Sequence, residues 1–86
     1  MGNGLVGKAW SVTDLYHTEK YVLIALSYYA DEKTKLAFLS YEELSRLTGI
    51  SNRQVKRVVK SLTDHNPPYI TPDSNVFNKS LWRVNL

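Results

Sequence analysis

The stretch Ser40–Leu62, SYEELSRLTGISNRQVKRVVKSL, decides the fold. It opens with Ser40 followed three residues later by Glu43, which is the spacing of a capping box. In such a box the serine hydroxyl accepts a hydrogen bond from the glutamate amide, and the carboxylate accepts one from the serine amide. The pattern therefore predicts a short helix that begins at Tyr41.

A tight turn and a second helix follow. Leu44 and Leu47 lie three residues apart on one face of the first helix, and Gly49 supplies the backbone freedom that ends a helix. Ser51 is placed to cap the next helix, with Gln54 completing a second capping box. Apolar residues then recur at intervals of three and four and predict a buried stripe, which consists of Val55, Val58, Val59 and Leu62.

The opposite face of this second helix is basic. Residues 44–63 include five basic side chains and no acidic one, so this window carries +5 while the rest of the chain sums to −2. Surface helices commonly mix signs to gain ion pairs between positions i and i+4, and this helix forgoes that gain. Two capped helices joined by a tight turn are typical of a helix-turn-helix, whose second helix enters the DNA major groove.

The flanking segments predict an α+β fold. Helical periodicity over about Tyr16–Ala30 indicates a central helix that is apolar nearly all round. The LAFL segment at 36–39 suits a short strand, and strands are predicted at 69–71 and 79–86. Between the last two, Pro72–Asn75 has turn chemistry, so the chain should end in a β-hairpin.

The order helix, strand, helix, turn, helix, strand, strand predicts a winged helix-turn-helix with three helices, in one domain over residues 1–86. Residues 1–14 are expected to form an N-terminal arm, with the glycine-rich first seven residues frayed. The chain ends directly after a predicted strand, as a piece of a longer protein would.

Composition narrows the function. The chain has no cysteine, which excludes disulfides, zinc ribbons and cysteine nucleophiles. There is no secretion signal, and the longest apolar stretch, Tyr21–Leu26, is far short of the roughly 20 residues that span a membrane. We therefore expect a cytoplasmic protein that does not enter membranes.

The sequence contains no catalytic motif. His17 and His65 lie far apart without metal-ligand spacing, and no phosphate-binding glycine loop or HExxH motif occurs. Asp14 and Glu19 form a possible carboxylate pair, but their place at a helix start suits stabilisation of the helix dipole. We expect a protein without enzymatic activity, cofactor or metal.

At the level of whole segments, the chain resembles a known family. The runs EKYVLIALSYYAD (19–31), FLSYEELSRLTGISNRQVKRVVKSL (38–62), YITP (69–72) and LWRVNL (81–86) are similar to the winged helix-turn-helix domain of phage and plasmid replication proteins and related bacterial regulators. The resemblance implies DNA binding through the third helix, from Ser51 to about Asp64, with the hairpin near the DNA backbone or minor groove. It leaves open which of these tasks the chain performs.

Contact roles follow from position along the third helix. Near its start, Asn52 suits an adenine edge and Arg53 a guanine edge, whereas Lys56 and Lys60 suit phosphates. The predicted DNA-binding residues are Ser51, Asn52, Arg53, Lys56, Arg57, Lys60, Lys79 and Arg83.

The partner is thus predicted to be double-stranded DNA, read as an origin-binding domain or as a small transcriptional regulator. A second copy of the chain or a replication or transcription protein is a further possible partner. The alternative function is a winged helix that docks on such a protein through the tyrosines of its first helix, Tyr21, Tyr28 and Tyr29.

Overall fold

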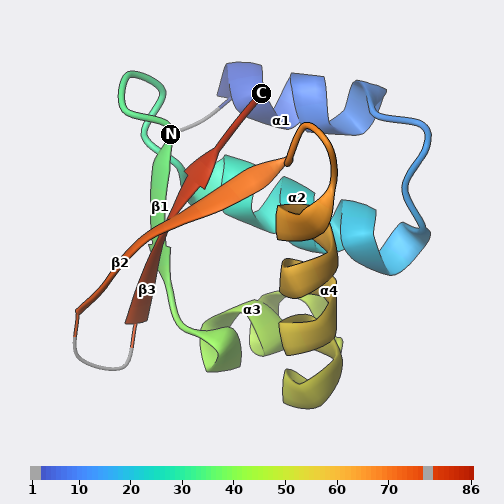
Figure 1. Ribbon diagram of the computed structural model, residues 1–86, viewed down its shortest axis with the longest axis vertical. Coiled ribbons are helices and arrows are strands. Elements are labelled where there is room, and N and C mark those ends of the chain that lie inside the picture. The colour runs from blue at the N-terminus through green and yellow to red at the C-terminus, as the bar shows by residue number, and fades with distance from the viewer. Residues whose placement is uncertain (1–2, 77–78) are drawn as a thin grey trace.

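The computed structural model describes residues 3–76 and 79–86, with side chains described for 4–73 and 80–86. The elements, in chain order, are α1 (Asn3–Ser11), α2 (His17–Tyr29), β1 (Leu36–Leu39), α3 (Tyr41–Thr48), α4 (Asn52–Asp64), β2 (Ile70–Val76) and β3 (Lys79–Val84). In Figure 1, α2 runs across the middle of the molecule, with α1 along one side and α3 and α4 on the other. The three strands form a small antiparallel sheet beside these helices, which is the arrangement of a winged helix-turn-helix.

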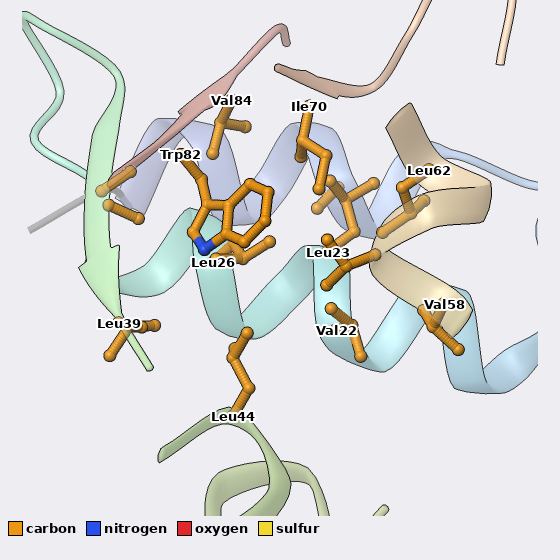
Figure 2. Packing of buried hydrophobic residues seen from close by; sticks show 14 of the residues in the cluster. Val22, Leu23, Leu26, Leu39, Leu44, Val58, Leu62, Ile70, Trp82 and Val84 are labelled. Atoms are coloured by element: carbon orange, nitrogen blue, oxygen red, sulfur yellow. The ribbon is translucent and has the colours of Figure 1, made fainter. Parts of the chain in front are cut away.

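Helix α2 is the centre of the core. Its Val22, Leu23 and Leu26 are fully buried, and they meet side chains from α4 and the sheet, including Leu62 and Ile70 (Figure 2). The predicted helix at about 16–30 is confirmed, and so is its central place.

The N-terminal segment differs from the expected frayed tail, because residues 3–11 form helix α1. Leu5 is 3% exposed and Ala9 is fully buried, and both belong to the core cluster that α2 centres. The apolar pairs of α1, Leu5-Val6 and Ala9-Trp10, are separated by Gly7 and Lys8, and glycine lowers helix propensity, so the sequence pattern offered little sign of a helix.

The predicted helix-turn-helix is confirmed, with a full capping box at the start of α3 and, at the start of α4, the half of one that Ser51 forms. Ser40 Oγ accepts a hydrogen bond from the Glu43 amide at 3.0 Å, and Glu43 Oε1 accepts one from the Ser40 amide at 3.3 Å. Helix α3 ends at Gly49, whose φ of 75° lies in the left-handed region that glycine adopts without penalty. Ser51 then caps α4 by accepting a hydrogen bond from the Gln54 amide at 3.3 Å.

One apolar position of α3 is not in the core. Leu44 is fully buried, but Leu47 is 49% exposed and lies beside Tyr28 and Tyr29 of α2. A helix of only eight residues turns one narrow side to the core, so its second leucine falls at the rim.

Helix α4 buries the predicted stripe. Val55 and Leu62 are fully buried, Val59 is 3% exposed and Val58 is 6% exposed. The helix ends at Asp64, before Pro67 and Pro68, which is where the sequence placed its end. Burial of this stripe leaves the basic residues on the outer side.

The sheet has the order β1-β3-β2, so the C-terminal strand is central. Leu36 pairs with Arg83 across β1 and β3, and Ile70 pairs with Val84 across β2 and β3. Trp82 and Val84 face the core.

The predicted turn at Pro72–Asn75 is wrong, because these residues lie inside β2. Pro72 pairs with Trp82 and Ser74 with Leu81, so Asp73 is an extra residue in a β-bulge. Proline is tolerated here because β2 is an edge strand, and the bulge accommodates the residue types that suggested a turn. The connection between β2 and β3 lies outside the described residues.

Candidate nucleic-acid interface

The outer face of α4 presents unpaired positive charge. The side chains of Arg53, Lys56, Arg57 and Lys60 are exposed, and none forms an ion pair with a residue that the structure describes. In Figure 1 this helix stands at the edge of the molecule, with its C-terminal end next to the start of β2. Burial of the valine stripe turns the basic side of α4 outward. These cations are therefore available to an incoming polyanion.

A hollow of about 430 Å³ separates α4 from the hairpin. Lys56 and Lys60 line it from the helix, and Asp73 and Trp82 line it from the sheet. Tyr41 closes it from α3, where its ring packs edge-on against Trp82 with centroids 6.0 Å apart. Lys56 Nζ lies 5.6 Å from the Tyr41 ring centroid, so a cation–π contact holds this lysine at the mouth of the hollow. Tyr41 is thus partly buried and packs against the core.

A second hollow of about 660 Å³ lies on the other flank of α4, against the start of α2. It is lined on the α4 side by Arg53, Gln54 and Arg57. On the other side it is lined by Tyr16, the residue directly before α2. Tyr16 is 78% exposed. Sequence reasoning missed this residue; its only signal was a tyrosine at a helix start, where small polar residues are preferred.

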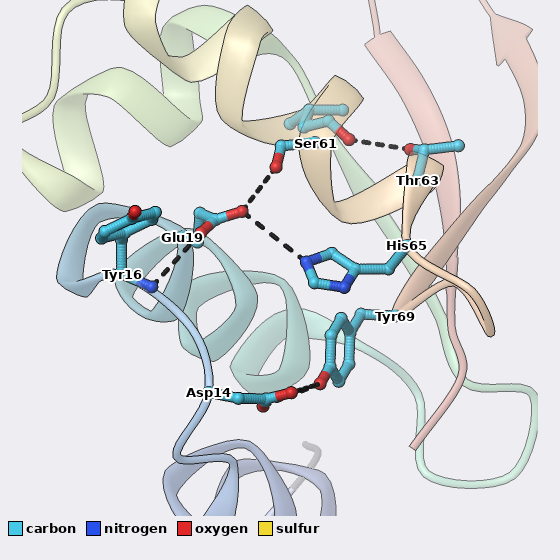
Figure 3. A network of polar contacts seen from close by, with 8 residues as sticks. Asp14, Tyr16, Glu19, Ser61, Thr63, His65 and Tyr69 are labelled. Atoms are coloured by element: carbon cyan, nitrogen blue, oxygen red, sulfur yellow. Dashed lines mark hydrogen bonds and ion pairs between the residues drawn. The ribbon is translucent and has the colours of Figure 1, made fainter.

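Polar contacts of Glu19 fix α4 against α2 (Figure 3). This side chain is buried, and its Oε2 accepts a hydrogen bond from Ser61 Oγ at 2.6 Å. Its Oε1 accepts one from the Tyr16 amide at 3.2 Å, and His65 Nε2 lies 3.9 Å from Oε2. Glu19 therefore does more than stabilise the helix dipole, since its hydrogen bonds join two residues that line the second hollow, Tyr16 and Ser61.

A second polar contact links the segment before α2 to the segment before β2. Tyr69 donates its hydroxyl proton to Asp14 Oδ1 at 3.0 Å (Figure 3). Burial, together with this hydrogen bond to a carboxylate, raises the pKa of Tyr69 above its ordinary value. Asp14 and Glu19 are thus engaged separately and do not act as a pair.

Comparison with known families agrees with this geometry. Residues 13–66, which run from just before α2 to just beyond α4, match the family described as helix-turn-helix domain. The chain belongs to this helix-turn-helix family. No curated protein and no solved structure matches the chain. Membership implies DNA as the partner and a domain type that is typically not catalytic.

The helix-turn-helix match excludes α1 and the hairpin, so the remaining predicted contacts depend on the structure alone. Arg83 is exposed on β3, but its guanidinium lies 3.9 Å from Asp73 Oδ1 and 3.5 Å from the Thr34 carbonyl oxygen. This arginine is partly neutralised within the hairpin. The backbone of Lys79 begins β3, and its side chain lies outside the described residues.

At the start of α4, Ser51 and Asn52 are both exposed, as a contact with DNA requires. The Ser51 hydroxyl oxygen accepts its capping hydrogen bond and can still donate its proton to an anion. In the described part of this helix-turn-helix protein, no group of three or more His, Cys, Asp or Glu side chains could hold a metal ion. None of its described helices has the length and apolar content needed to cross a membrane.

Proposed function

We propose that this helix-turn-helix protein binds duplex DNA by inserting the outer face of α4 into the major groove. The observation that supports this proposal is the row of exposed cations on α4 that have no ion-pair partner among the described side chains, opposite the buried valine stripe. An α-helix with its side chains is about 10–12 Å across, which suits a major groove about 12 Å wide.

The positions along α4 suggest how the contacts divide. Asn52 and Arg53 lie in the first turn, where side chains reach base edges, and suit adenine and guanine respectively. Lys56 and Lys60 lie on the flank nearer the hairpin and suit phosphates. Ser51, Arg57, Lys79 and Arg83 complete the proposed set of contacts.

Two wider roles fit this proposal: the origin-binding domain of a replication initiator, or a small transcriptional regulator. Both act on DNA, which favours the cytoplasmic location expected from the sequence. Selection of bound sequences from a random duplex pool would identify the site, and a palindromic result would show that two copies bind together.

The experiment that tests DNA binding is a salt titration with the selected duplex. Neutralisation of four to six phosphates predicts that log K falls against log salt concentration with a slope of roughly −4 to −5. A duplex affinity that does not respond to salt would remove the proposed mechanism.

The alternative, docking on a replication or transcription protein, has one feature in its favour. Tyr21, Tyr28 and Leu47 are exposed around an apolar hollow of about 470 Å³ between α2 and α3. The unpaired cations of α4 favour DNA over this alternative, because a protein-docking surface on α2 gives them no role. NMR shifts on adding duplex distinguish the two: changes on α4 support DNA binding, and changes confined to α2 support docking.

A further inference from the structure

Two hollows beside α4, the one shared with the hairpin and the one shared with the start of α2, lie on opposite flanks of the helix. A third hollow, of about 510 Å³, is lined by Arg57 and Lys60 together, so Lys56 and Arg53 are the residues that distinguish the two flanks. Lys56 lines only the hollow on the hairpin side, whereas Arg53 lines only the hollow on the α2 side, together with Arg57. If α4 occupies the major groove as proposed above, the sugar-phosphate backbones of the two DNA strands border it on these flanks. Each hollow then faces a different strand.

The charges of the described side chains differ between the two flanks. On the hairpin side, the cations Lys56 and Lys60 share the hollow with Asp64 and Asp73. On the α2 side, Arg53 and Arg57 share the hollow with one acidic side chain, that of Glu19. The Glu19 carboxylate already accepts hydrogen bonds from Ser61 and from the Tyr16 amide, which lowers its repulsion of an anion. The α2 side is therefore the more favourable of the two for a phosphate.

Tyr16 adds a neutral donor to this flank. It is the most exposed of the large hydrophobic side chains in the described part of the chain, at 78%, so its ring and hydroxyl are open to a ligand. Its backbone is fixed by the hydrogen bond from its amide to Glu19 Oε1 at 3.2 Å. Because Tyr16 lines the same hollow as Arg53 and Arg57, its phenol hydroxyl is suited to donate to a phosphate oxygen there.

We propose that Tyr16 and Arg57 together bind a phosphodiester of one DNA strand, while Lys56 and Lys60 bind a phosphodiester of the other strand. This inference rests on the proposed DNA binding and adds a contact residue outside α3 and α4. It also assigns each flank of α4 to one strand.

The first test compares Tyr16→Phe with the unchanged protein on the selected duplex. Loss of the hydroxyl should weaken binding about ten- to a hundredfold, because a hydrogen bond to a charged group is lost. The slope of log K against log salt should stay the same, because no charge is removed. Arg57→Ala should instead reduce that slope by about 1.

Tyr28→Phe is the matched control, since Tyr28 is also exposed on α2 but lines the apolar hollow. This variant should bind as the unchanged protein does. Equal affinity of Tyr16→Phe and the unchanged protein would overturn the role of Tyr16 while leaving duplex binding intact.

The second test replaces single phosphates of the duplex by neutral methylphosphonates. A replacement at a contacted phosphate should lower the affinity of the unchanged protein for the duplex. It should lower the affinity of a variant that lacks the contacting side chain much less. For Arg57→Ala the insensitive positions should lie on one strand, and for Lys56→Ala they should lie on the other. Insensitive positions on the same strand would overturn the assignment of strands alone, whereas no binding of any duplex by the unchanged protein would overturn both proposals.

Discussion

Arg53 can contribute to DNA binding through its positive charge and through the planar shape of its guanidinium group. It is exposed in the first turn of α4, one helical turn before Arg57. A guanidinium presents a rigid fork of donors that matches two acceptors of guanine, whereas a lysine ammonium is a point charge. The same position therefore tests whether α4 reads sequence or only neutralises charge.

Substitution Arg53→Ala should weaken binding to the selected duplex by about 1–3 kcal/mol and relax its preference at one base pair. Arg53→Lys should retain the salt slope but lose that preference, because it keeps the charge without the fork. Competition binding with duplexes altered at single base pairs measures both effects. Lys33→Ala, which removes an exposed cation from the loop before β1, is the control and should change neither. An unchanged preference in both Arg53 variants would contradict base reading.

Gly49 supplies the one positive-φ glycine in the described part of the chain, at 75°. Substitution Gly49→Ala should lower the free energy of unfolding by about 1–2 kcal/mol, because a Cβ is strained in the left-handed region. Space is not the cause, since nothing lies within 4 Å of the added carbon. Gly49→Asn should cost less, because asparagine tolerates this conformation.

The control for this prediction is the same change inside a helix. Gly7 lies in α1 with equally open surroundings, so Gly7→Ala should raise the free energy of unfolding by about 0.5–1 kcal/mol. Urea denaturation of the two alanine variants should thus give changes of opposite sign. Changes of the same sign would show that backbone conformation does not decide the effect.

At the scale of elements, single contacts join segments that are distant in sequence. The hydrogen bond of Tyr69 to Asp14 links the residues before β2 to those before α2, and the raised pKa of Tyr69 makes this link dependent on pH. A tyrosine whose pKa is raised on folding contributes its stability fully below the unfolded pKa, and that contribution is lost as the pH rises through the folded pKa.

The unchanged protein should therefore be more stable than Tyr69→Phe by an amount that is constant below a pH of about 10 and that declines at higher pH. Urea denaturation of both proteins between pH 8 and pH 11 measures this difference. Tyr28→Phe, at an exposed position without such a bond among the described residues, should show no corresponding decline. A difference that grows above pH 10 would reverse the assigned direction of the shift.

The helices of the helix-turn-helix could be predicted from the sequence because capping residues and apolar spacing are local signals. Ser40 with Glu43, Gly49 and the stripe of α4 lie where those signals placed them. The Pro72–Asn75 segment was misread because a strand that contains a bulge at Asp73 uses the same residue types as a turn. Only the pairing partner, β3, distinguishes the two cases.

In the candidate interface, too, some features could be predicted from local sequence patterns and others depend on how the helices pack. Exposure of Arg53 and Arg57 follows from their spacing relative to the buried valines, so the sequence sufficed. The proximity of Tyr16 to these arginines did not follow, because it depends on how α2 packs across α4 and on the buried contact of Glu19 with Ser61. Packing angles between helices are set by side chains from several elements at once.

On the scale of the whole molecule, α1 extends the core beyond the segment that matches the family. Leu5→Ala should lower the free energy of unfolding by about 2–3 kcal/mol, because it leaves a cavity where α1 meets the core. Val6→Ala, at a half-buried position of the same helix, should cost less. Thermal and urea unfolding measure both changes. Under conditions where both variants are folded, their affinity for the duplex should equal that of the unchanged protein, since α1 lies apart from α4 (Figure 1). A loss of affinity in folded Leu5→Ala would contradict this separation.

The central position of β3 has a consequence for the order of assembly. Strands β1 and β2 do not pair with each other, and each pairs only with β3 within the described sheet. During synthesis, α2, α3 and α4 leave the ribosome before β3 exists, so these helices can associate through local contacts first. Strand β3 can pair with β2 as a local hairpin, but it must also pair with β1 across a long chain separation, and we expect that late step to limit the rate at which the native molecule appears.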